Sequence, residues 1–376
     1  MVVRRQEVTR ETPNSYESAV LGQIRECIWR RHRWYMDHTD RVETSYSNWF
    51  SFVVAYVGGG LRRFLGDPDA EAVRRFAEIP WNFEYLYGRL DREEDRELLS
   101  RLVARRALDA ESVPLVDVSK ERISLRRLER DVARHGGPEV LEDRGWRMPL
   151  MNVRPYGLDA KFFANAIVLM YSFVKRQYEC PGIGFSAGPG DHVVDAGACY
   201  GDTALTFADQ VRPNGSVYSF EMVPENLSVM RENLKQNPDL ASRVTVFSRP
   251  LGARDGVACR INTGRAGASV STVGSDADVD ESEPSVATMS IDALHQRGLL
   301  ARVDMIKMDI EGAEVEALKG AEQTIRKFRP RLAICIYHSP EDFEAIPRLI
   351  DSFGQDYRFA LGHYSGSLLE TVLYCY

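Results

Sequence analysis

The stretch VVDAGACYGDT, residues 193–203, decides the fold of this chain. It begins as a short apolar, β-branched run, contains Gly197 and Gly201, and continues into the helical pattern DTALTFADQV. Glycines at these positions let the backbone turn sharply and approach a ligand closely. Ligands of doubly wound sheets bind beyond the carboxyl ends of the strands. We therefore interpret this stretch as the first strand of an α/β sheet, with a candidate binding loop at its end.

Short apolar runs alternate with helical patterns from residue 192 to the C-terminus. HVVDAG is followed by SVYSFE, RVTVFSRP, VDMIKMD and RLAICIY, with helical segments between most of them. Such alternation is typical of a doubly wound, mostly parallel sheet. The last two runs, YRFALGHY and LLETVLYCY, predict an antiparallel hairpin at one edge of that sheet. A long polar stretch between Gly264 and Pro284 predicts a mobile surface loop.

The N-terminal part differs in composition from the rest. Residues 1–150 hold all five tryptophans and 26 residues of each charge, whereas residues 151–376 hold 29 acidic and 22 basic residues. We predict a polar arm at 1–45, a mainly helical accessory or substrate domain at 46–150, and the sheet domain at 151–376. The apolar pattern of residues 161–181 predicts a buried helix that leads into the sheet domain.

Composition excludes several classes of protein. The 376 residues are 44% hydrophobic and 27% charged, which is typical of a soluble globular protein. No apolar run approaches the ~20 residues that span a bilayer, and the N-terminus has no signal-peptide pattern. The six cysteines have no zinc-site spacing. Without a basic excess a nucleic-acid partner is not supported, so we predict a cytoplasmic protein with no nucleic-acid partner and no membrane span.

A carboxylate follows the second predicted strand. Glu221 ends the run SVYSFE, where a carboxylate can accept hydrogen bonds from both hydroxyls of a ribose. The dinucleotide motif G-x-G-x-x-G does not fit, because Cys199 and Asp202 stand at its second and third glycine positions. Two plainer interpretations stay open: the loop is a tight strand-to-helix turn, and Glu221 is a surface acid near the helix that begins at Pro224.

The loop also resembles the first motif of methyltransferases that use S-adenosyl-L-methionine (AdoMet), with an acid two residues before Gly197 and a second glycine four residues after it. Longer runs carry a closer resemblance: GDHVVDAGACYGDTALTFAD, VYSFEMVPENL, VDMIKMDIEGAEVEALKGAEQTIRKFRPRLAICIYHSPEDFEAIPRLI and HYSGSLLETVLYCY. Together these runs, within residues 178–376, resemble the FkbM family of methyltransferases. The resemblance implies a seven-stranded class I methyltransferase fold.

The family resemblance also implies a reaction. It implies O-methylation of a hydroxyl on a sugar, a glycoconjugate or a polyketide-type natural product. The cofactor would be AdoMet, with S-adenosyl-L-homocysteine as product, and the partner a small-molecule or glycan acceptor.

The resemblance assigns roles to individual residues. Glu221 would hold the ribose, and Met222 would lie against adenine, although methionine is also a routine gap filler in a core. Asp309 would face the cofactor amine or the methyl group. The loop around the amino-acid end of AdoMet would consist of Asp195, Gly197, Ala198, Gly201, Asp202 and Thr203.

Transfer to an alcohol requires alignment of the acceptor and removal of its proton. His338 directly follows the run RLAICIY, so we expect it at the carboxyl edge of the sheet as the base or as the residue that orients the acceptor. The alternative is an imidazole at the edge of the core. His363 is the second candidate. Asp309 and Glu311 complete the catalytic candidates, although Glu311 also fits a first-turn acid that complements a helix dipole. Lys307 shares a strand face with Asp309 and is expected to pair with a carboxylate.

Other functions remain open. Asp309, Glu311 and His338 could gather a divalent ion, but nothing in the sequence requires one, and we assign no metal ligand. Methylation of a nitrogen in a peptide, amine or nucleic acid is a second function. Methyltransferases that act on nucleic-acid amines normally have, after the fourth strand, an Asn or Asp followed by Pro-Pro and an aromatic residue, whereas this chain has MDIEGAE there. A non-catalytic cofactor-binding module is a third function. A homodimer is compatible with the sequence.

Overall fold

The structure is a computed structural model of the chain, and it describes residues 16–27, 74, 76, 83–108, 118–263, 268–272 and 286–376. The chain divides into two compact units. The first comprises Met1–Gly88 and Glu93–Leu115, and the second comprises Arg89–Arg92 and Val116–Tyr376. The predicted polar arm at 1–45 lies outside the described residues except for 16–27.

The described part of the first unit is helical. A helix covers residues 16–27, and it is followed by α4 (Glu84–Arg89) and α5 (Glu93–Leu108). Leu99, Leu102 and Val103 lie at helical spacing on α5 and are buried, as expected for the apolar side of an amphipathic helix. The predicted helical character is therefore confirmed in this region.

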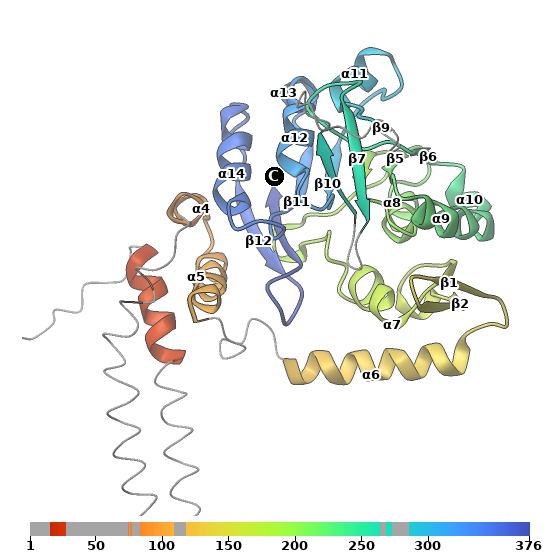
Figure 1. Cartoon of the computed structure of the whole chain (residues 1–376), viewed down its shortest axis with the longest axis horizontal. Coiled ribbons are helices and arrows are strands. Elements are labelled where there is room, and N and C mark those ends of the chain that lie inside the picture. The colour runs from red at the N-terminus through yellow and green to blue at the C-terminus, as the bar shows by residue number, and fades with distance from the viewer. Residues whose placement is uncertain are drawn as a thin grey trace, which may run out of the picture. The chain divides into compact units, whose positions relative to one another are not determined.

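A seven-stranded sheet forms the centre of the second unit (Figure 1). Its strands are β4 (His192–Ala196), β5 (Ser216–Phe220), β6 (Val244–Phe247), β10 (Met305–Met308), β11 (Arg331–Cys335), β12 (Phe359–His363) and β13 (Thr371–Cys375). Their order is β12-β13-β11-β10-β4-β5-β6. β13 pairs antiparallel with β11 and β12, and the other neighbours pair parallel. The predicted doubly wound sheet with a terminal antiparallel hairpin is confirmed.

Helices connect the strands of this sheet. They are α8 (Asp202–Gln210), α9 (Pro224–Gln236), α10 (Pro238–Ala241), α11 (Ile291–Gln296), α12 (Glu314–Lys319), α13 (Glu322–Phe328) and α14 (Asp342–Ser352). Figure 1 shows α8, α9 and α10 grouped near β5 and β6, and α12, α13 and α14 grouped near β10 and β11. None of the helices in the described ranges combines the length and apolar character needed to cross a membrane.

Two secondary-structure predictions are wrong ahead of the sheet. The elements there are α6 (Val118–His135), β1 (Val140–Asp143), β2 (Trp146–Asn152), η2 (Arg154–Tyr156), β3 (Lys161–Phe163), α7 (Ala166–Val168), η3 (Leu169–Val174) and η4 (Pro181–Ile183). The helical prediction for 46–150 thus fails at β1 and β2, and the helix predicted over 161–181 begins instead as β3.

Tertiary contacts explain both differences. β1, β2 and β3 form an antiparallel sheet in that order. The amide of Phe163 donates to Asn233 Oδ1 at 2.7 Å, which holds β3 extended. Asn165 then caps a new helix by accepting the amides of Ile167 and Val168. Since Met148 belongs to the same core cluster as the sheet strands, the compact unit begins at Val116 and not at residue 151.

The polar segment expected as a surface loop contains a strand. β7 (Ala258–Thr263) pairs antiparallel with β8 (Ala268–Thr272) and with β9 (Val286–Ala287). The loop predicted between Gly264 and Pro284 is therefore wrong over residues 268–272, because the backbone of β8 completes its hydrogen bonds on β7. The rest of that predicted loop lies outside the described residues.

An ion pair is buried at the centre of the main sheet. Lys307 on β10 and Asp195 on β4 have side chains 1% and 0% exposed, with 3.2 Å between Nζ and Oδ1. Asp195 also accepts hydrogen bonds from the hydroxyls of Thr203 and Ser219. Burial lowers the pKa of Lys307, but the charges of Asp195 and Asp309 outweigh burial and raise it. The predicted pairing of Lys307 with a carboxylate is confirmed.

Substituting Lys307 tests how much this pair stabilises the fold. Lys307→Met leaves Asp195 buried without its cation, so we expect the free energy of unfolding to fall by about 3–5 kcal/mol. Urea denaturation monitored by circular dichroism measures the change. Lys319→Met is the control, because Lys319 pairs with Glu316 at the surface and exposed pairs contribute at most about 1 kcal/mol. Equal losses in the two variants would contradict the assignment.

Candidate functional site

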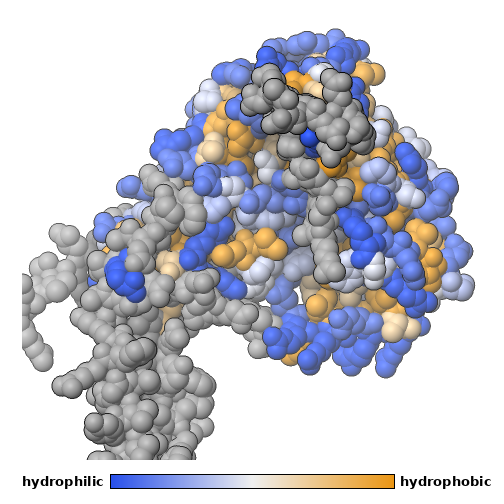
Figure 2. Space-filling view, in the orientation of Figure 1, coloured by the Kyte–Doolittle hydropathy of each residue, from blue (hydrophilic) through white to orange (hydrophobic). Residues whose placement is uncertain are grey.

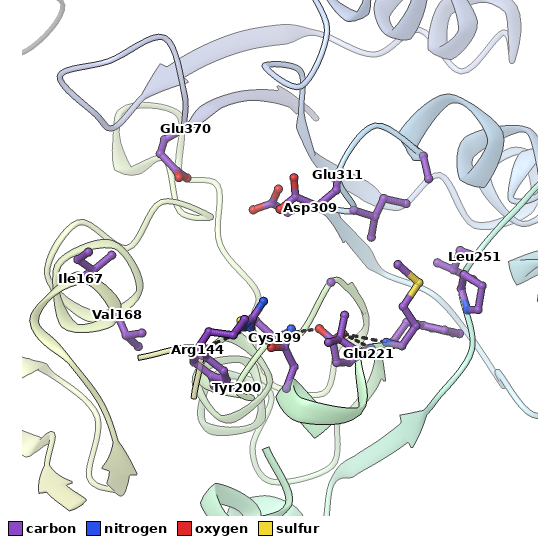
Figure 3. A pocket seen from close by; sticks show the side chains of 18 of the residues that line it. Arg144, Ile167, Val168, Cys199, Tyr200, Glu221, Leu251, Asp309, Glu311 and Glu370 are labelled. Atoms are coloured by element: carbon purple, nitrogen blue, oxygen red, sulfur yellow. Dashed lines mark hydrogen bonds between the residues drawn. The ribbon is translucent and has the colours of Figure 1, made fainter. Parts of the chain in front are cut away.

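A cavity of about 420 Å³ lies beyond the carboxyl ends of β4, β5, β10 and β11. Each strand is followed by a residue that lines it: Gly197, Glu221, Asp309 and Tyr337 respectively. Figure 3 shows that labelled side chains surround this space, with Asp309, Glu311 and Glu370 on one side and Cys199 and Glu221 across from them. The cavity thus occupies the position at which ligands bind in doubly wound sheets.

The loop after β4 is tightly constrained. Gly197 and Gly201 have φ of +80° and +85°, a left-handed conformation that glycine adopts without steric cost. A Cβ at Gly197 would lie 1.8 Å from the carbonyl oxygen of Asp309. Lys307 Nζ donates to the carbonyl oxygens of Ala196 at 3.0 Å and Gly197 at 2.6 Å. The buried lysine therefore holds the loop from the side away from the cavity.

Most of the predicted loop residues lie behind the cavity. Asp195 is fully buried and satisfied by Lys307 and Thr203, and Ala198 is also fully buried. Asp202 accepts a hydrogen bond from the hydroxyl of Ser172. Of the six residues predicted to surround the amino-acid end of the cofactor, Gly197 is the one that lines the cavity among the residues that the structure describes. The others shape the loop.

Glu221 is held by the backbone. Oε1 accepts the amides of Met222 and Val223 at 2.8 Å each, and Oε2 accepts the amide of Cys199 at 2.9 Å. Burial raises the pKa of Glu221, although these hydrogen bonds act in the opposite direction. Met222 lines the same part of the cavity, next to Phe220 and Leu251. The structure therefore places Glu221 and Met222 together at the end of β5.

Three side chains hold the Asp309 carboxylate. Oδ2 accepts from the hydroxyl of Tyr178 at 2.8 Å, and Oδ1 accepts from the hydroxyl of Tyr337 at 3.0 Å. Oδ1 also lies 3.3 Å from His338 Nε2. Burial alone would raise the pKa of Asp309, but His338 and Lys307 outweigh it and hold the pKa well below its usual range. Asp309 is therefore ionised at neutral pH.

His338 lies among carboxylates. Nδ1 is 3.1 Å from Glu314 Oε1, and Nε2 is 3.3 Å from Asp309 Oδ1 and 3.6 Å from Glu311 Oε2. Its side chain is 8% exposed and is absent from the cavity lining. Burial lowers the pKa of His338, but Asp309 and Glu314 outweigh burial and raise it to about 11. An imidazolium has no lone pair with which to accept a proton, so this raised pKa favours a positioning role over the predicted role as base.

Two other carboxyl groups in the cavity have pKa values in the range that suits a base. Burial raises the pKa of Glu311 to about 7, against the effect of His338. Burial and the charge of Asp309 raise the pKa of Glu370 to about 7. Both side chains line the cavity, and Figure 3 shows Glu370 on the opposite side of Asp309 from Glu311. Glu311 was a sequence candidate, whereas Glu370, within SLLETVLY, was missed because its segment reads as a strand.

His363 lies elsewhere. Its Nδ1 is 2.9 Å from the hydroxyl of Thr371 across the β12–β13 hairpin. It lines a separate depression with Lys120 and Tyr364 and does not line the cavity. β12 runs in the same direction as β11, because β13 pairs antiparallel with both, so His363 lies at the same edge of the sheet but two strands away from β11. His363 is therefore not brought together with the other catalytic candidates.

One wall of the cavity was not anticipated from the sequence. It consists of Arg144 and Trp146 from the β1–β2 hairpin and of Ile167 and Val168 from α7. Trp146 is 46% exposed and Ile167 is 39% exposed. Large apolar side chains exposed at a cavity favour binding of a partly apolar ligand. The tryptophan-rich composition was the available signal, but it did not single out Trp146.

The metal alternative involves a different set of residues from the expected one. Asp309, Glu314 and His338 each offer a ligand atom within 4.8 Å of the others, whereas the sequence suggested Glu311 in place of Glu314. A histidine ligates a metal only when neutral. Because the carboxylates hold His338 protonated, the imidazolium itself balances their charge. The assignment of no metal ligand stays a prediction.

Comparison with known proteins matches part of the chain, from β4 to β12, to a protein family. Residues 195–359 match the family model of the methyltransferase FkbM domain. The chain carries an FkbM methyltransferase domain. This confirms the family resemblance. The FkbM match extends from β4 to the start of β12, so it includes Glu221, Asp309, Glu311 and His338 but not Glu370.

One solved structure supports the fold of this region. The crystal structure of methyltransferase FkbM from Methylobacillus flagellatus KT is 21% identical with a TM-score of 0.50, and the match covers 83% of this chain and 61% of that chain. The chain thus spans about three fifths of that relative. Aeropyrum pernix fibrillarin, in complex with natively bound AdoMet, is 12% identical over 63% of this chain and 99% of that chain, with a TM-score of 0.35. No curated protein matches the chain.

The protonation of His338 is open to direct measurement. With a pKa near 11, its imidazole should stay protonated from pH 5 to pH 9 in ¹⁵N NMR spectra, with His338→Gln used for assignment. His192 is the internal control, because burial and Arg302 lower its pKa. The pKa of His338 is higher in the folded protein than in the unfolded chain. Protonation of His338 therefore stabilises the fold fully below about pH 6.5, and this contribution to the free energy of unfolding is lost as the pH rises towards 11. Titration of His338 near pH 6.5 would contradict this.

Proposed function

We propose that the chain is an AdoMet-dependent O-methyltransferase that acts on a hydroxyl of a sugar, a glycoconjugate or a polyketide-type natural product. One observation carries the proposal. The glycine loop and Glu221 line one side of a cavity whose other side holds ionised Asp309 and the carboxyl groups of Glu311 and Glu370. A cationic sulfonium cofactor and a hydroxyl acceptor both suit such a site, and the FkbM domain supports the same interpretation.

The residues at the end of β5 fit the nucleoside of AdoMet. An ionised carboxylate has about four acceptor positions, and three backbone amides occupy part of this capacity at Glu221. The ribose hydroxyls would donate to the remaining positions. Met222 and Leu251 would cover the adenine with apolar surface. This assignment keeps the roles that the family resemblance implied for Glu221 and Met222.

The carboxylates suit the methyl-transfer step. The cofactor supplies an activated methyl group, and the acceptor oxygen forms its bond to this methyl as the carbon–sulfur bond breaks and S-adenosyl-L-homocysteine leaves. The acceptor proton passes to Glu311, whose pKa of about 7 matches the range in which a general base is efficient at neutral pH. His338 acts as a positioning residue that keeps Asp309 ionised beside the sulfonium.

Substitution of Glu221 tests the cofactor site. Glu221→Gln removes the negative charge and one acceptor oxygen, so we expect the dissociation constant for AdoMet to rise about tenfold or more in calorimetric titration, because a hydrogen bond to a charged group contributes about 1.5–3 kcal/mol. Glu225→Gln is the matched control, since Glu225 lies exposed on α9. AdoMet binding that is unchanged in a folded Glu221→Gln protein would remove Glu221 from the site.

Substitution of Glu311 tests the base. In the native protein, kcat/KM should rise with pH through about 7, because the base must be ionised to accept the proton. Glu311→Gln should lower kcat by about 10²–10⁴-fold and remove this rising limb while AdoMet still binds. The control is Glu316→Gln, an exposed acid on α12. A pH profile that Glu311→Gln leaves unchanged would assign the base elsewhere.

The acceptor class is tested by product analysis. The protein is incubated with AdoMet carrying a labelled methyl group and with glycan and metabolite extracts, and products that gain one methyl are identified by mass spectrometry. Label on a sugar or metabolite oxygen is the expected result. Label found only on nitrogen, or only in RNA or protein, would overturn the proposed function in favour of N-methylation or macromolecule methylation.

A further inference from the structure

Helix α6 (Val118–His135) is basic in a chain that is acidic overall. It holds six lysine and arginine residues against three acids, whereas the whole chain has a net charge of −7. The helix lies in the second unit but takes no part in the cavity described above. Figure 2 shows mainly hydrophilic residues along the edge of the molecule where Figure 1 places α6. Its charges therefore need a separate explanation.

Two of the three acids of α6 lie on the inner side of the helix, which packs against the rest of the unit. Glu121 pairs with Lys175 at 2.6 Å, and Asp131 accepts from the hydroxyl of Tyr156 at 3.3 Å. Lys175 directly follows η3, which packs against α6, and Tyr156 belongs to η2. Leu128, between the two acids in the sequence, is buried. Two of the three acids are thus used on the inner side of α6. Only Glu129 remains among the exposed acids of this helix.

The outer side carries a row of arginines. Residues four apart lie on the same side of a helix, and the exposed side chains at this spacing are Arg122, Arg126, Arg130 and Arg134. At 1.5 Å per residue they follow one another every ~6 Å over ~18 Å. Among the residues that the structure describes, no carboxylate lies within ion-pair distance of any of the four. Ile123 stands beside the row and is 64% exposed.

We propose that this outer side of α6 binds the chain to an anionic lipid surface. Four cations against the single exposed acid Glu129 beside them attract a surface of phosphate headgroups, and an exposed isoleucine next to them can enter the boundary between headgroups and acyl chains. Ile123 favours a membrane over a nucleic acid, because a phosphodiester backbone offers no apolar layer. The net negative charge of the whole chain opposes binding through other faces and so sets one orientation.

Packing relates this surface to the cavity wall. α6 packs against α7 and β2, and these elements supply Ile167 and Trp146 to the cavity. Attachment through α6 would therefore hold this wall close to the membrane. The inference itself does not rest on the proposed function, since it uses no residue assigned to cofactor or acceptor.

Vesicle flotation with the full chain tests the proposal. The probes are vesicles of phosphatidylcholine alone and vesicles in which about 30% of the lipid is phosphatidylglycerol. We expect the protein to float with the anionic vesicles and not with the neutral ones. Binding should fall steeply when the salt concentration rises from about 0.1 M to about 0.5 M, because screening shortens the range of surface electrostatics.

Matched variants identify the face that binds. Arg126→Gln combined with Arg130→Gln should lower the partition coefficient for anionic vesicles about 25-fold, since each cation near such a surface raises that coefficient about fivefold. Ile123→Ser should weaken it further. The control combines Arg231→Gln with Arg254→Gln, which removes the same charge from exposed positions elsewhere. Thermal unfolding checks that all variants remain folded, and AdoMet binding provides a second readout that the α6 variants should not change.

Three results would overturn the proposal. They are equal binding to both kinds of vesicle, equal loss in the α6 and control variants, and retention of binding by Arg126→Gln/Arg130→Gln. Arginine-dependent binding to duplex DNA or heparin without binding to anionic vesicles would also overturn it, and would indicate a soluble polyanion as the partner. A failure of AdoMet binding in the native protein would contradict the proposed function and leave the vesicle result unaffected.

Discussion

The arrangement of the site depends on the buried contact between Lys307 and Asp195. The ammonium group joins β10 to β4 through the Asp195 carboxylate, and it also donates to the carbonyl oxygens of Ala196 and Gly197. The ring of Tyr178 lies 5.0 Å from the same Nζ, and the hydroxyl of Tyr178 donates to Asp309. One buried cation therefore positions both the glycine loop and the main carboxylate of the cavity. Its burial makes it costly to lose, since an unpaired charge would be left in the core.

A second cation sets the protonation of the cavity. His338 lies between Asp309 and Glu314 and close to Glu311, so its positive charge balances a group of acids that would otherwise repel one another. The environments of these acids differ, and so do their pKa values: that of Asp309 is held low, whereas those of Glu311 and Glu370 are raised to about 7. Such separation of pKa values lets neighbouring carboxyl groups take different roles. The raised pKa of His338 agrees with the positioning role that we propose for it.

Sequence patterns predicted the main sheet well, because the strands are buried and the periodicity changes clearly between strand and helix. They failed at residues 146–152 and 161–163, where strands β2 and β3 pair with each other and contact the core. In a sequence, a short buried strand and a buried helix show similar runs of apolar residues, and only the partner strand distinguishes them. Glu370 was missed for a related reason, since it lies in the connection between β12 and β13, and it reaches the cavity because β13 pairs with β11.

The sequence by itself determined the order of strands and helices, the glycine loop, and the acids that end β5 and β10, because each of these depends on local spacing. The tertiary structure decided which of those groups face the cavity and in which direction their pKa values shift. Asp195 and Asp202 lie behind the cavity and hold the loop. The pKa of His338 is raised, because a pKa depends on charges brought together from separate segments. The same is true of α6, where packing leaves two of the three acids on the inner side and a row of arginines on the exposed side.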